Sequence, residues 1–541
     1  MLFSPHKLGG LVRIFISILV TSLVLVMSPP ATGVAGVPAN SARTTYESPR
    51  ADTGNVCLDS DVSSLLSSAQ PGGLLAPPQD VTAESGLIEG RLYRVLYATS
   101  APNGKAQAAC AMVATPEGTS INSFLVEGHG AWGLKQECQP SMKVTNFVSS
   151  PDPSAQGAGP LFSTVKSGGV FVAPDFPAAG TGSENLQPIG HGVAQGVSML
   201  DAARVVTGNP TEFGLAPVAS DAEIPLVFTG YSQGGGAALW AAQLTTFYLN
   251  LRRDRTLNLA GVIAYEPAGT QIVAAPQEPR SLDGFHFADR ISYGSLTGSI
   301  YLSWVARSWS QIRQADSGAL PFGPSGGVQL SSVLSKTGVQ TSAETVRFCS
   351  SEQLLLGLTV AKYRNPNSYR LLQAPFAGAK TKGVWKSAFD VTCSKTSGLS
   401  RPVRNVCAWL QFNTIGPNGL NPFPKLPTDN AGELVPIHLV HGTDDHTVWC
   451  VDSEGAVEPR NCLTAQFYDS LASAYCGGNG YLHADYMIGV GHGGIYWPSF
   501  TNRETGGWYF GSPFETFVSG ALAKTLPKTC GTTNLEPIQG S

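Results

Sequence analysis

The chain has 541 residues, enough to bury a large core and still carry an insertion. Charged residues make up 13% of it, against about 25% in an average soluble protein, and its 61 glycines and 38 prolines indicate many loops. The formal net charge is −4, and no dense run of Lys and Arg follows the N-terminus. This composition excludes the electrostatic signature of a nucleic-acid-binding protein.

Residues 1–39 are predicted to be a signal peptide for export. Lys7 and Arg13 form its positive start, and residues 14–27 form an apolar stretch. Small residues follow, with possible cleavage sites at 37–39 and at 40–42. The apolar stretch is shorter than the ~20 residues of a membrane span, and no later segment is long and apolar enough for one. We therefore expect a protein without a transmembrane segment that is secreted to the extracellular space or to the cell envelope.

Ten cysteines, an even number, lie beyond this signal. In an exported chain such a set favours disulfides over a metal site, and no Cys-x-x-Cys pair is present. Cys450 with Cys462 and Cys393 with Cys407 are close in sequence, and we predict a disulfide between Cys450 and Cys462.

Strands and helices are predicted to alternate through residues 90–268, after an N-terminal arm at 40–89. Val193, Val197 and Leu200 recur at helical spacing and indicate a crossover helix between two buried strands. The predicted strands are 91–99, 106–115, 123–127, 169–174, 224–228 and 259–265.

This alternation stops between residues 269 and 400, where helical pieces at 296–309 and 353–363 lie among loops rich in glycine and proline. It returns in 401–541, with strands at 436–440 and 484–490. The pattern predicts an α/β fold whose mostly parallel, doubly wound sheet carries a large, mainly helical cap as an insertion.

The strongest chemical signal is Gly230-x-Ser232-x-Gly234, placed between a buried strand and a helix. A serine on a sharp strand-to-helix turn has a strained backbone that needs glycine neighbours, and its hydroxyl projects above the sheet. Ser232 is the predicted nucleophile. The amide of Gln233, at the start of the helix, is a predicted oxyanion donor.

A serine needs a base, and in such folds the acid and the histidine follow the serine in the chain. His492 lies between glycines after the last predicted strand of the sheet and is the predicted base. Asp444 and Asp445 follow the strand at 436–440, where α/β sheets build their sites, and either carboxylate could orient the histidine.

A second oxyanion donor is expected from the loop after an earlier strand. That loop is Gly128-His129-Gly130-Ala131-Trp132-Gly133. Its glycines let the backbone amides approach a substrate oxygen. The amide of Trp132 is the preferred donor, and that of Ala131 is the next choice.

Several motifs together resemble the secretory lipase family of α/β-hydrolases, whose members come from fungi and actinobacteria. They are His129-Gly130 with Cys138-Gln139-Pro140-Ser141, Ala173-Pro174-Asp175-Phe176-Pro177 with Leu200-Asp201-Ala202-Ala203-Arg204, Gly230 to Ala237, and His441-Gly442-Thr443-x-Asp445 with Gly491-His492. The resemblance spans about residues 85–500. It places the acid three residues after the glycine, which favours Asp445 over Asp444.

The resemblance implies lipase or carboxylesterase activity on small-molecule or lipid esters, met in solution or at a lipid–water interface. It implies no metal and no organic cofactor. An acyltransferase would use the same residues with an alcohol as acceptor, and a peptidase would need a subsite that we cannot locate. A non-catalytic binding module would have a broken triad, whereas all three positions are occupied here.

Overall fold

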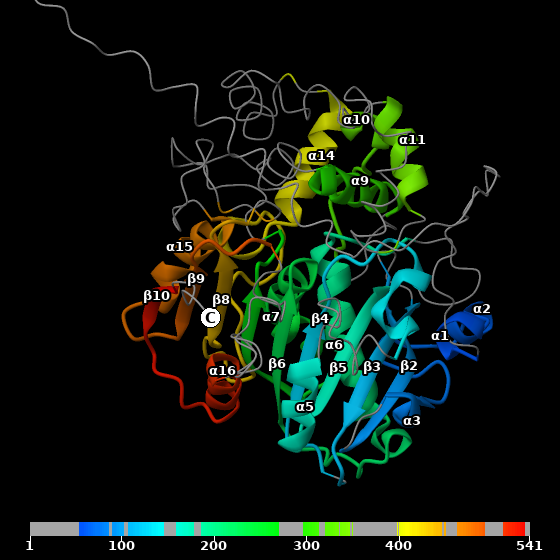
Figure 1. Cartoon of the computed structure of the whole chain (residues 1–541), viewed down its shortest axis with the longest axis vertical. Coiled ribbons are helices and arrows are strands. Elements are labelled where there is room, and N and C mark those ends of the chain that lie inside the picture. Colours follow the sequence, from blue (N-terminus) through cyan, green and yellow to red (C-terminus); the bar gives the residue numbers. More distant parts are fainter. Residues whose placement is uncertain are drawn as a thin grey trace, which may run out of the picture. The chain divides into compact units, whose positions relative to one another are not determined.

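The computed structural model (Figure 1) describes residues 54–85, 89–101, 106–118, 120–144, 158–177, 186–269, 296–312, 320–334, 336–346, 349, 398, 400–445, 448, 450, 462–492 and 512–535. The predicted signal peptide lies outside these residues, as does the predicted helical piece at 353–363. No helix in the described part of the chain combines the length and apolar character needed to cross a bilayer.

Ten strands of the described chain form one sheet in the order β1-β2-β3-β5-β4-β6-β7-β8-β9-β10. Strands β1, β2, β3 and β5 pair antiparallel in that order, and every pairing from β5 to β10 is parallel. The strands are β1 (Gln79–Asp80), β2 (Arg91–Ser100), β3 (Ala106–Thr115), β4 (Phe124–Gly128), β5 (Val170–Pro177), β6 (Ile224–Tyr231), β7 (Leu257–Tyr265), β8 (Ile437–Gly442), β9 (Leu482–Met487) and β10 (Cys530–Leu535).

Helices cover both faces of the sheet, because alternate side chains of each strand point to opposite faces and both faces are apolar. Val126 and Phe228 pack into one core with α6, α7 and α15. Leu125 and Val227 pack into the other core with α5 and α16. These helices are α5 (Ala158–Lys166), α6 (Gly192–Gly208), α7 (Gln233–Arg252), α15 (Leu463–Tyr475) and α16 (Ser512–Leu522). The predicted α/β architecture with a mostly parallel sheet is thus confirmed.

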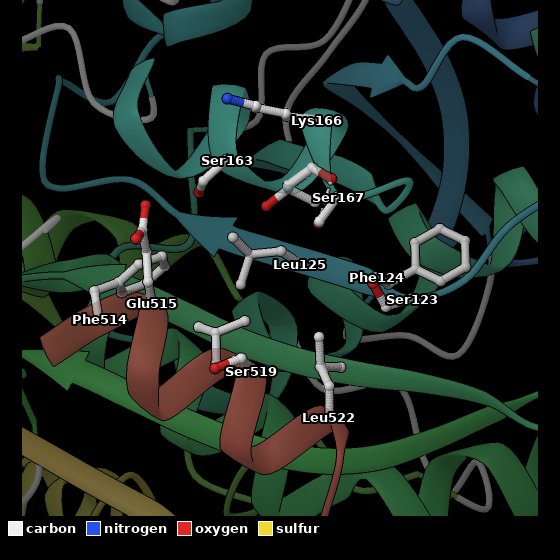
Figure 2. Close-up of a pocket in the computed structure, with 12 residues that line it drawn as sticks. Ser123, Phe124, Leu125, Ser163, Lys166, Ser167, Phe514, Glu515, Ser519 and Leu522 are labelled. Atoms are coloured by element: carbon white, nitrogen blue, oxygen red, sulfur yellow. Dashed lines mark hydrogen bonds between the residues drawn. The ribbon is translucent and has the colours of Figure 1, made fainter. Parts of the chain in front are cut away.

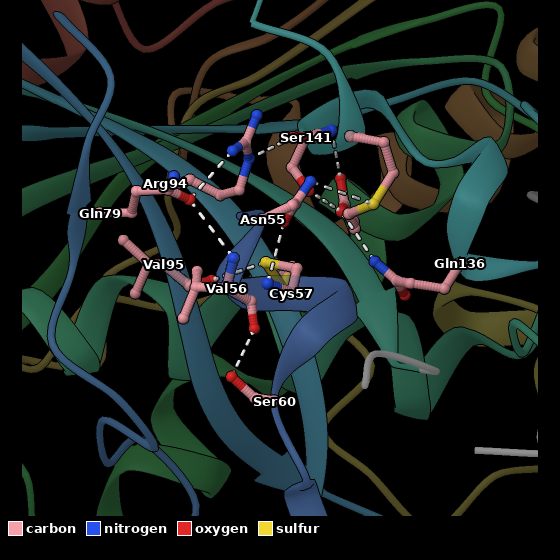
Figure 3. The surroundings of a disulfide bond; sticks show 12 residues. Asn55, Val56, Cys57, Ser60, Gln79, Arg94, Val95, Gln136 and Ser141 are labelled. Atoms are coloured by element: carbon pink, nitrogen blue, oxygen red, sulfur yellow. Dashed lines mark hydrogen bonds between the residues drawn. A yellow bond between two sulfur atoms is a disulfide. The ribbon is translucent and has the colours of Figure 1, made fainter. Parts of the chain in front are cut away.

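The predicted arm folds against the first strands of the sheet. Short helices of the arm pack on β2 and β3, and a disulfide joins Cys57 to Cys110. Figure 3 shows the buried Arg94 of β2 beside this disulfide, with Nη1 donating to Oε1 of Gln79 (3.0 Å) and Nε to the carbonyl of Ser141 (2.8 Å). Arg94 therefore joins the arm to the segment that follows β4. The short helices are α1 (Val56–Asp59), α2 (Val62–Leu66) and α3 (Thr82–Ser85), and the 3₁₀ turns are η1 (Gln136–Cys138), η2 (Pro140–Met142), η3 (Pro210–Phe213) and η6 (Gly416–Asn418).

Helices and turns make up the described part of the predicted cap. Its helices are α9 (Leu296–Gln311), α10 (Leu330–Val333) and α11 (Lys336–Thr345), and α14 (Arg401–Phe412) follows. The buried indole of Trp304 donates to Oγ1 of Thr345 (3.1 Å), which joins α9 to α11. The rings of Trp309 and Trp409 lie 5.7 Å apart, which joins α9 to α14.

A cavity of about 360 Å³ opens between α5 and α16, beside the amino end of β4 (Figure 2). Leu125, Phe514 and Leu522 give it an apolar lining. The residues with predicted chemical roles follow the carboxyl ends of the strands, so this cavity is separate from them.

Candidate active site

Ser232 lies at the sharp turn between β6 and α7, with φ 54° and ψ −116°. A positive φ is strained for a residue with a side chain, and it persists only where the surroundings enforce it. Here two glycines make the turn possible. A Cβ on Gly234 would lie 1.8 Å from the carbonyl oxygen of Gly128, and one on Gly230 would lie 2.3 Å from that of Gly234.

His492 lies in the loop after β9 and reaches Ser232 from there. Its Nε2 is 3.0 Å from Oγ of Ser232, and its Nδ1 is 2.7 Å from Oδ2 of Asp445. Its ring also packs against Tyr231, with 5.1 Å between the ring centroids. A carboxylate can only accept, so Nδ1 carries the proton and Nε2 is free to accept one from the serine hydroxyl.

Asp445 and Asp444 are adjacent but lie in different surroundings. Asp445 is buried, and its Oδ1 accepts a hydrogen bond from the amide of Val448 (2.8 Å). Asp444 is exposed, and its amide donates to the carbonyl of Val490 (2.9 Å). The structure therefore brings Asp445, and not Asp444, to His492.

His441 supports the Asp445 carboxylate from the end of β8. Its Nε2 donates to the carbonyl of Val448 (2.8 Å) and lies 3.1 Å from Oδ2 of Asp445, while its Nδ1 lies 2.5 Å from Oγ1 of Thr464. Burial alone would raise the pKa of Asp445, but the charge of His492 and the hydrogen bonds from His441 and His492 hold it well below its usual range. Asp445 is therefore ionised at neutral pH.

Glu266 is a second carboxylate beside His492 that the sequence did not single out. It directly follows β7 and is fully buried, and its Oε2 lies 3.3 Å from Nδ1 of His492. Burial would lower the pKa of His492, but the charges of Asp445 and Glu266 raise it above 6.5. The available signal was an acidic residue at the carboxyl end of a buried strand, which is where such sheets place their chemistry.

Among the described residues, Glu266, Asp445 and His492 are the group whose donor atoms lie close enough to hold a cation, within 4.8 Å of one another. A cation bound there would have to displace the proton on Nδ1 of His492. The same atoms therefore cannot form the hydrogen-bonded chain and a metal site at once.

The predicted oxyanion donors come from two segments of the chain, the start of α7 and the loop after β4. Gln233 is the first residue of α7, and its side chain donates to Oε1 of Gln187 (3.3 Å). The loop that holds Trp132 begins beside the turn, since the amide nitrogen of His129 is 2.7 Å from where a Cβ on Gly234 would lie. Trp132 itself is half-buried in this loop. Its role, like that of Ala131, stays a prediction.

Gln187 fixes the loop after β4 to its neighbours. Its Nε2 donates to Oε1 of Gln139 (2.8 Å) and to the carbonyl of Asp175 (2.9 Å), while its own carbonyl accepts from Oγ of Ser308 in α9 (2.8 Å). A disulfide between Cys138 and Cys349 joins the same loop to the residues after α11. The predicted cap is therefore attached directly to the loop with the predicted oxyanion donors.

The predicted pairing of Cys450 with Cys462 corresponds to a disulfide in the structure. The amide of Cys450 donates to the carbonyl of Asp445 (3.0 Å), so this bridge closes a loop that begins at the acid. Cys476 and Cys530 form another disulfide, which joins the end of α15 to β10.

Solved structures of similar fold include lipase A of Candida antarctica, with 13% identity over 86% of each chain and a TM-score of 0.52. Its closed state gives 15% identity, a TM-score of 0.50 and coverage of 86% of this chain and 85% of the lipase. The chain has the α/β-hydrolase fold. At these identities the likeness establishes the fold alone. No family model and no curated protein matches the sequence.

Proposed function

We propose that the protein is a serine hydrolase of carboxylic esters. The observation that carries the proposal is the hydrogen-bonded chain from Ser232 through His492 to Asp445, with distances of 3.0 and 2.7 Å. A neutral histidine between a serine hydroxyl and an ionised carboxylate is the arrangement that makes serine a nucleophile at neutral pH.

In the proposed reaction Oγ of Ser232 attacks the ester carbonyl while Nε2 of His492 takes its proton. The Asp445 carboxylate holds the ring in the required tautomer and stabilises the imidazolium that forms. The backbone amides of Gln233 and Trp132 are the proposed donors to the oxyanion. His492 then protonates the leaving alcohol, and water releases the acid by the same steps in reverse.

We propose lipid-like esters as substrates and an extracellular location. The solved structures of similar fold are named as lipases, and the Cys138–Cys349 disulfide ties the predicted cap to the loop that follows β4. An apolar acyl site should raise kcat/KM several-fold for each added carbon or pair of carbons until it is filled, since a buried methylene contributes about 0.8 kcal/mol. Esters with acyl chains of two to sixteen carbons test this; a steady fall from acetate would leave a short-chain carboxylesterase.

The central test is Ser232→Ala, assayed on p-nitrophenyl esters and on a triglyceride emulsion. We expect the turnover to fall by about 10⁶-fold, because a nucleophile of this kind contributes about that much, while the circular dichroism spectrum stays native. A fluorophosphonate probe should label the wild-type protein at Ser232 and leave the variant unlabelled. Full activity in a folded Ser232→Ala variant would refute the proposal.

A further inference from the structure

We propose that Glu266 is a second positioning carboxylate for His492, so that the base is held by two acids from neighbouring strands rather than by one. An effect of Glu266 on catalysis presupposes the proposed function. The contact itself does not depend on that function, because Oε2 of Glu266 lies 3.3 Å and Oδ2 of Asp445 lies 2.7 Å from Nδ1 of His492.

The sheet places both acids on one histidine. Strands β7 and β8 are parallel neighbours, with Tyr265 beside Val440 in register. Each strand is followed by a carboxylate, Glu266 after β7 and Asp445 in the turn after β8. Because parallel strands end at the same edge of a sheet, both side chains reach the loop that carries His492.

The backbone holds Glu266 in a costly conformation. Its φ is 43°, a left-handed value that is rare for a residue with a side chain, and its amide donates to the carbonyl of Val440 (2.7 Å). Gly442 on β8 leaves room for the backbone of Val490 and for the carboxylate, since a Cβ there would lie 2.3 Å from the carbonyl oxygen of Val490 and 3.0 Å from Oε1 of Glu266. Strain of this kind that is kept beside reacting atoms points to a function for the residue.

The charges around His492 define what Glu266 contributes. The titratable groups that face the imidazole in the described chain are Asp445 from the loop after β8, Glu266 from β7 and the Tyr231 ring from β6. His441 faces Asp445, with its Nε2 3.1 Å from Oδ2 of that carboxylate. Asp445 is the nearer acceptor for Nδ1–H, and Glu266 is close enough for an ion pair when His492 becomes an imidazolium. Glu266 would therefore stabilise the protonated base and keep the ring in place when the Asp445 contact is weakened.

The experiment compares Glu266→Gln, Asp445→Asn and the double variant, with Asp444→Asn as the matched control that removes a neighbouring but exposed charge. We expect Glu266→Gln to move the acid limb of the kcat/KM profile to lower pH by about 1 pH unit, because it removes a negative charge at ion-pair distance. Asp444→Asn should leave the limb in place. A purely structural role for Glu266 would lower kcat or stability without moving the limb.

The second part of the experiment compares Asp445→Asn with the double variant. Its first result, the activity of Asp445→Asn, does not require the Glu266→Gln variant to fold. Loss of the acid in a triad with one carboxylate costs about 10⁴-fold in kcat. With Glu266 in place, Asp445→Asn should lose at least tenfold less than that, and the double variant should fall to the full loss. An unmoved acid limb in Glu266→Gln, or a full 10⁴-fold loss in Asp445→Asn alone, would overturn the proposal.

A titration of His492 by ¹⁵N NMR in the Ser232→Ala background separates this inference from the proposed function, because it needs no turnover. Glu266→Gln should lower the His492 pKa there even if no ester is ever hydrolysed. An unchanged pKa would reject Glu266 as a partner of His492 whatever the enzyme assays give.

Discussion

His492 is the proposed base and can act only while Nε2 carries no proton, so its pKa would set the pH range of the proposed activity. Burial opposes the charged ring, but the carboxylates of Asp445 and Glu266 raise the pKa above 6.5. We therefore expect kcat/KM to be at its plateau above that raised pKa and to fall about tenfold per pH unit below it. Initial rates between pH 4 and pH 9 measure this, and a plateau that continued well below pH 6.5 would contradict it.

The residues of the site differ in how well the sequence identifies them. Ser232 and His492 stand between glycines in turns that follow strands, and this pattern leaves few other roles for them. Asp445 could not be separated from Asp444 by local pattern, because only the packed turn decides which of two adjacent side chains points inward. Glu266 was missed because its only signal is its place after Tyr265, and its approach to His492 depends on the pairing of β7 with β8.

At the scale of elements, the tight contact between β4 and the start of α7 is the feature most easily tested. A methyl group on Gly234 would overlap the backbone of Gly128, where neither side can retreat. Gly234→Ala should therefore cost about 3 kcal/mol or more in stability and abolish activity. Gly208→Ala at the end of α6 is the matched control, because nothing lies within 4 Å of the added Cβ; it should be neutral or stabilising by about 0.5–1 kcal/mol. Thermal unfolding of both variants gives the comparison, and equal losses would contradict it.

The N-terminus of α6 is capped by a histidine that must stay neutral. Nδ1 of His191 accepts from the amide of Ala194 (3.1 Å), and Nε2–H donates to the carbonyl of Phe322 (2.5 Å). Burial lowers the pKa of His191 from 6.5 to about 4. The unfolded chain therefore binds a proton between pH 6.5 and pH 4 that the folded chain does not, and stability is lost as the pH falls through this range.

His191→Asn can keep the cap on Ala194 but removes this linkage. It should be less stable than the wild type at pH 7, and the difference should shrink by up to about 3 kcal/mol as the pH falls to 4, since one pH unit is worth 1.36 kcal/mol. Denaturant unfolding of both proteins across this pH range measures the difference. If the free energies of unfolding of the two proteins changed in parallel with pH, His191 would take up its proton in the folded protein as readily as in the unfolded chain.

The strands of the sheet were predicted well where both faces are buried. Continuous apolar runs such as those of β4, β6 and β7 are typical of strands that are buried on both faces. The observed strands therefore differ from the predicted ones only at their ends. The last strand, β10, escaped notice because it lies at the edge of the sheet, and only Cys530 and Leu535 in it are apolar. An edge strand buries one side, so composition alone gives it no distinct pattern.

At the scale of the whole molecule, the disulfides should differ in their contribution to stability. Cys138 and Cys349 lie 211 positions apart in the sequence, and Cys450 and Cys462 lie 12 positions apart. The loop-entropy estimate gives about 5 kcal/mol for the first bridge and about 3 kcal/mol for the second. Replacing each pair by alanines should lower the denaturant midpoint in that order. The reverse order would mean that the local loop beside Asp445 contributes more than chain closure does.

The long bridge also has a consequence for biosynthesis. The chain emerges from its N-terminus, and no cysteine lies between Cys138 and Cys349 in the sequence. Until Cys349 has been made, the thiol of Cys138 can pair within the sequence only with Cys57 or Cys110, which are bonded to each other in the finished protein. Production in an oxidising compartment should therefore trap mispaired chains unless a disulfide isomerase is present. The yield of active protein should rise with added isomerase, and it should rise less for a Cys138→Ala/Cys349→Ala variant.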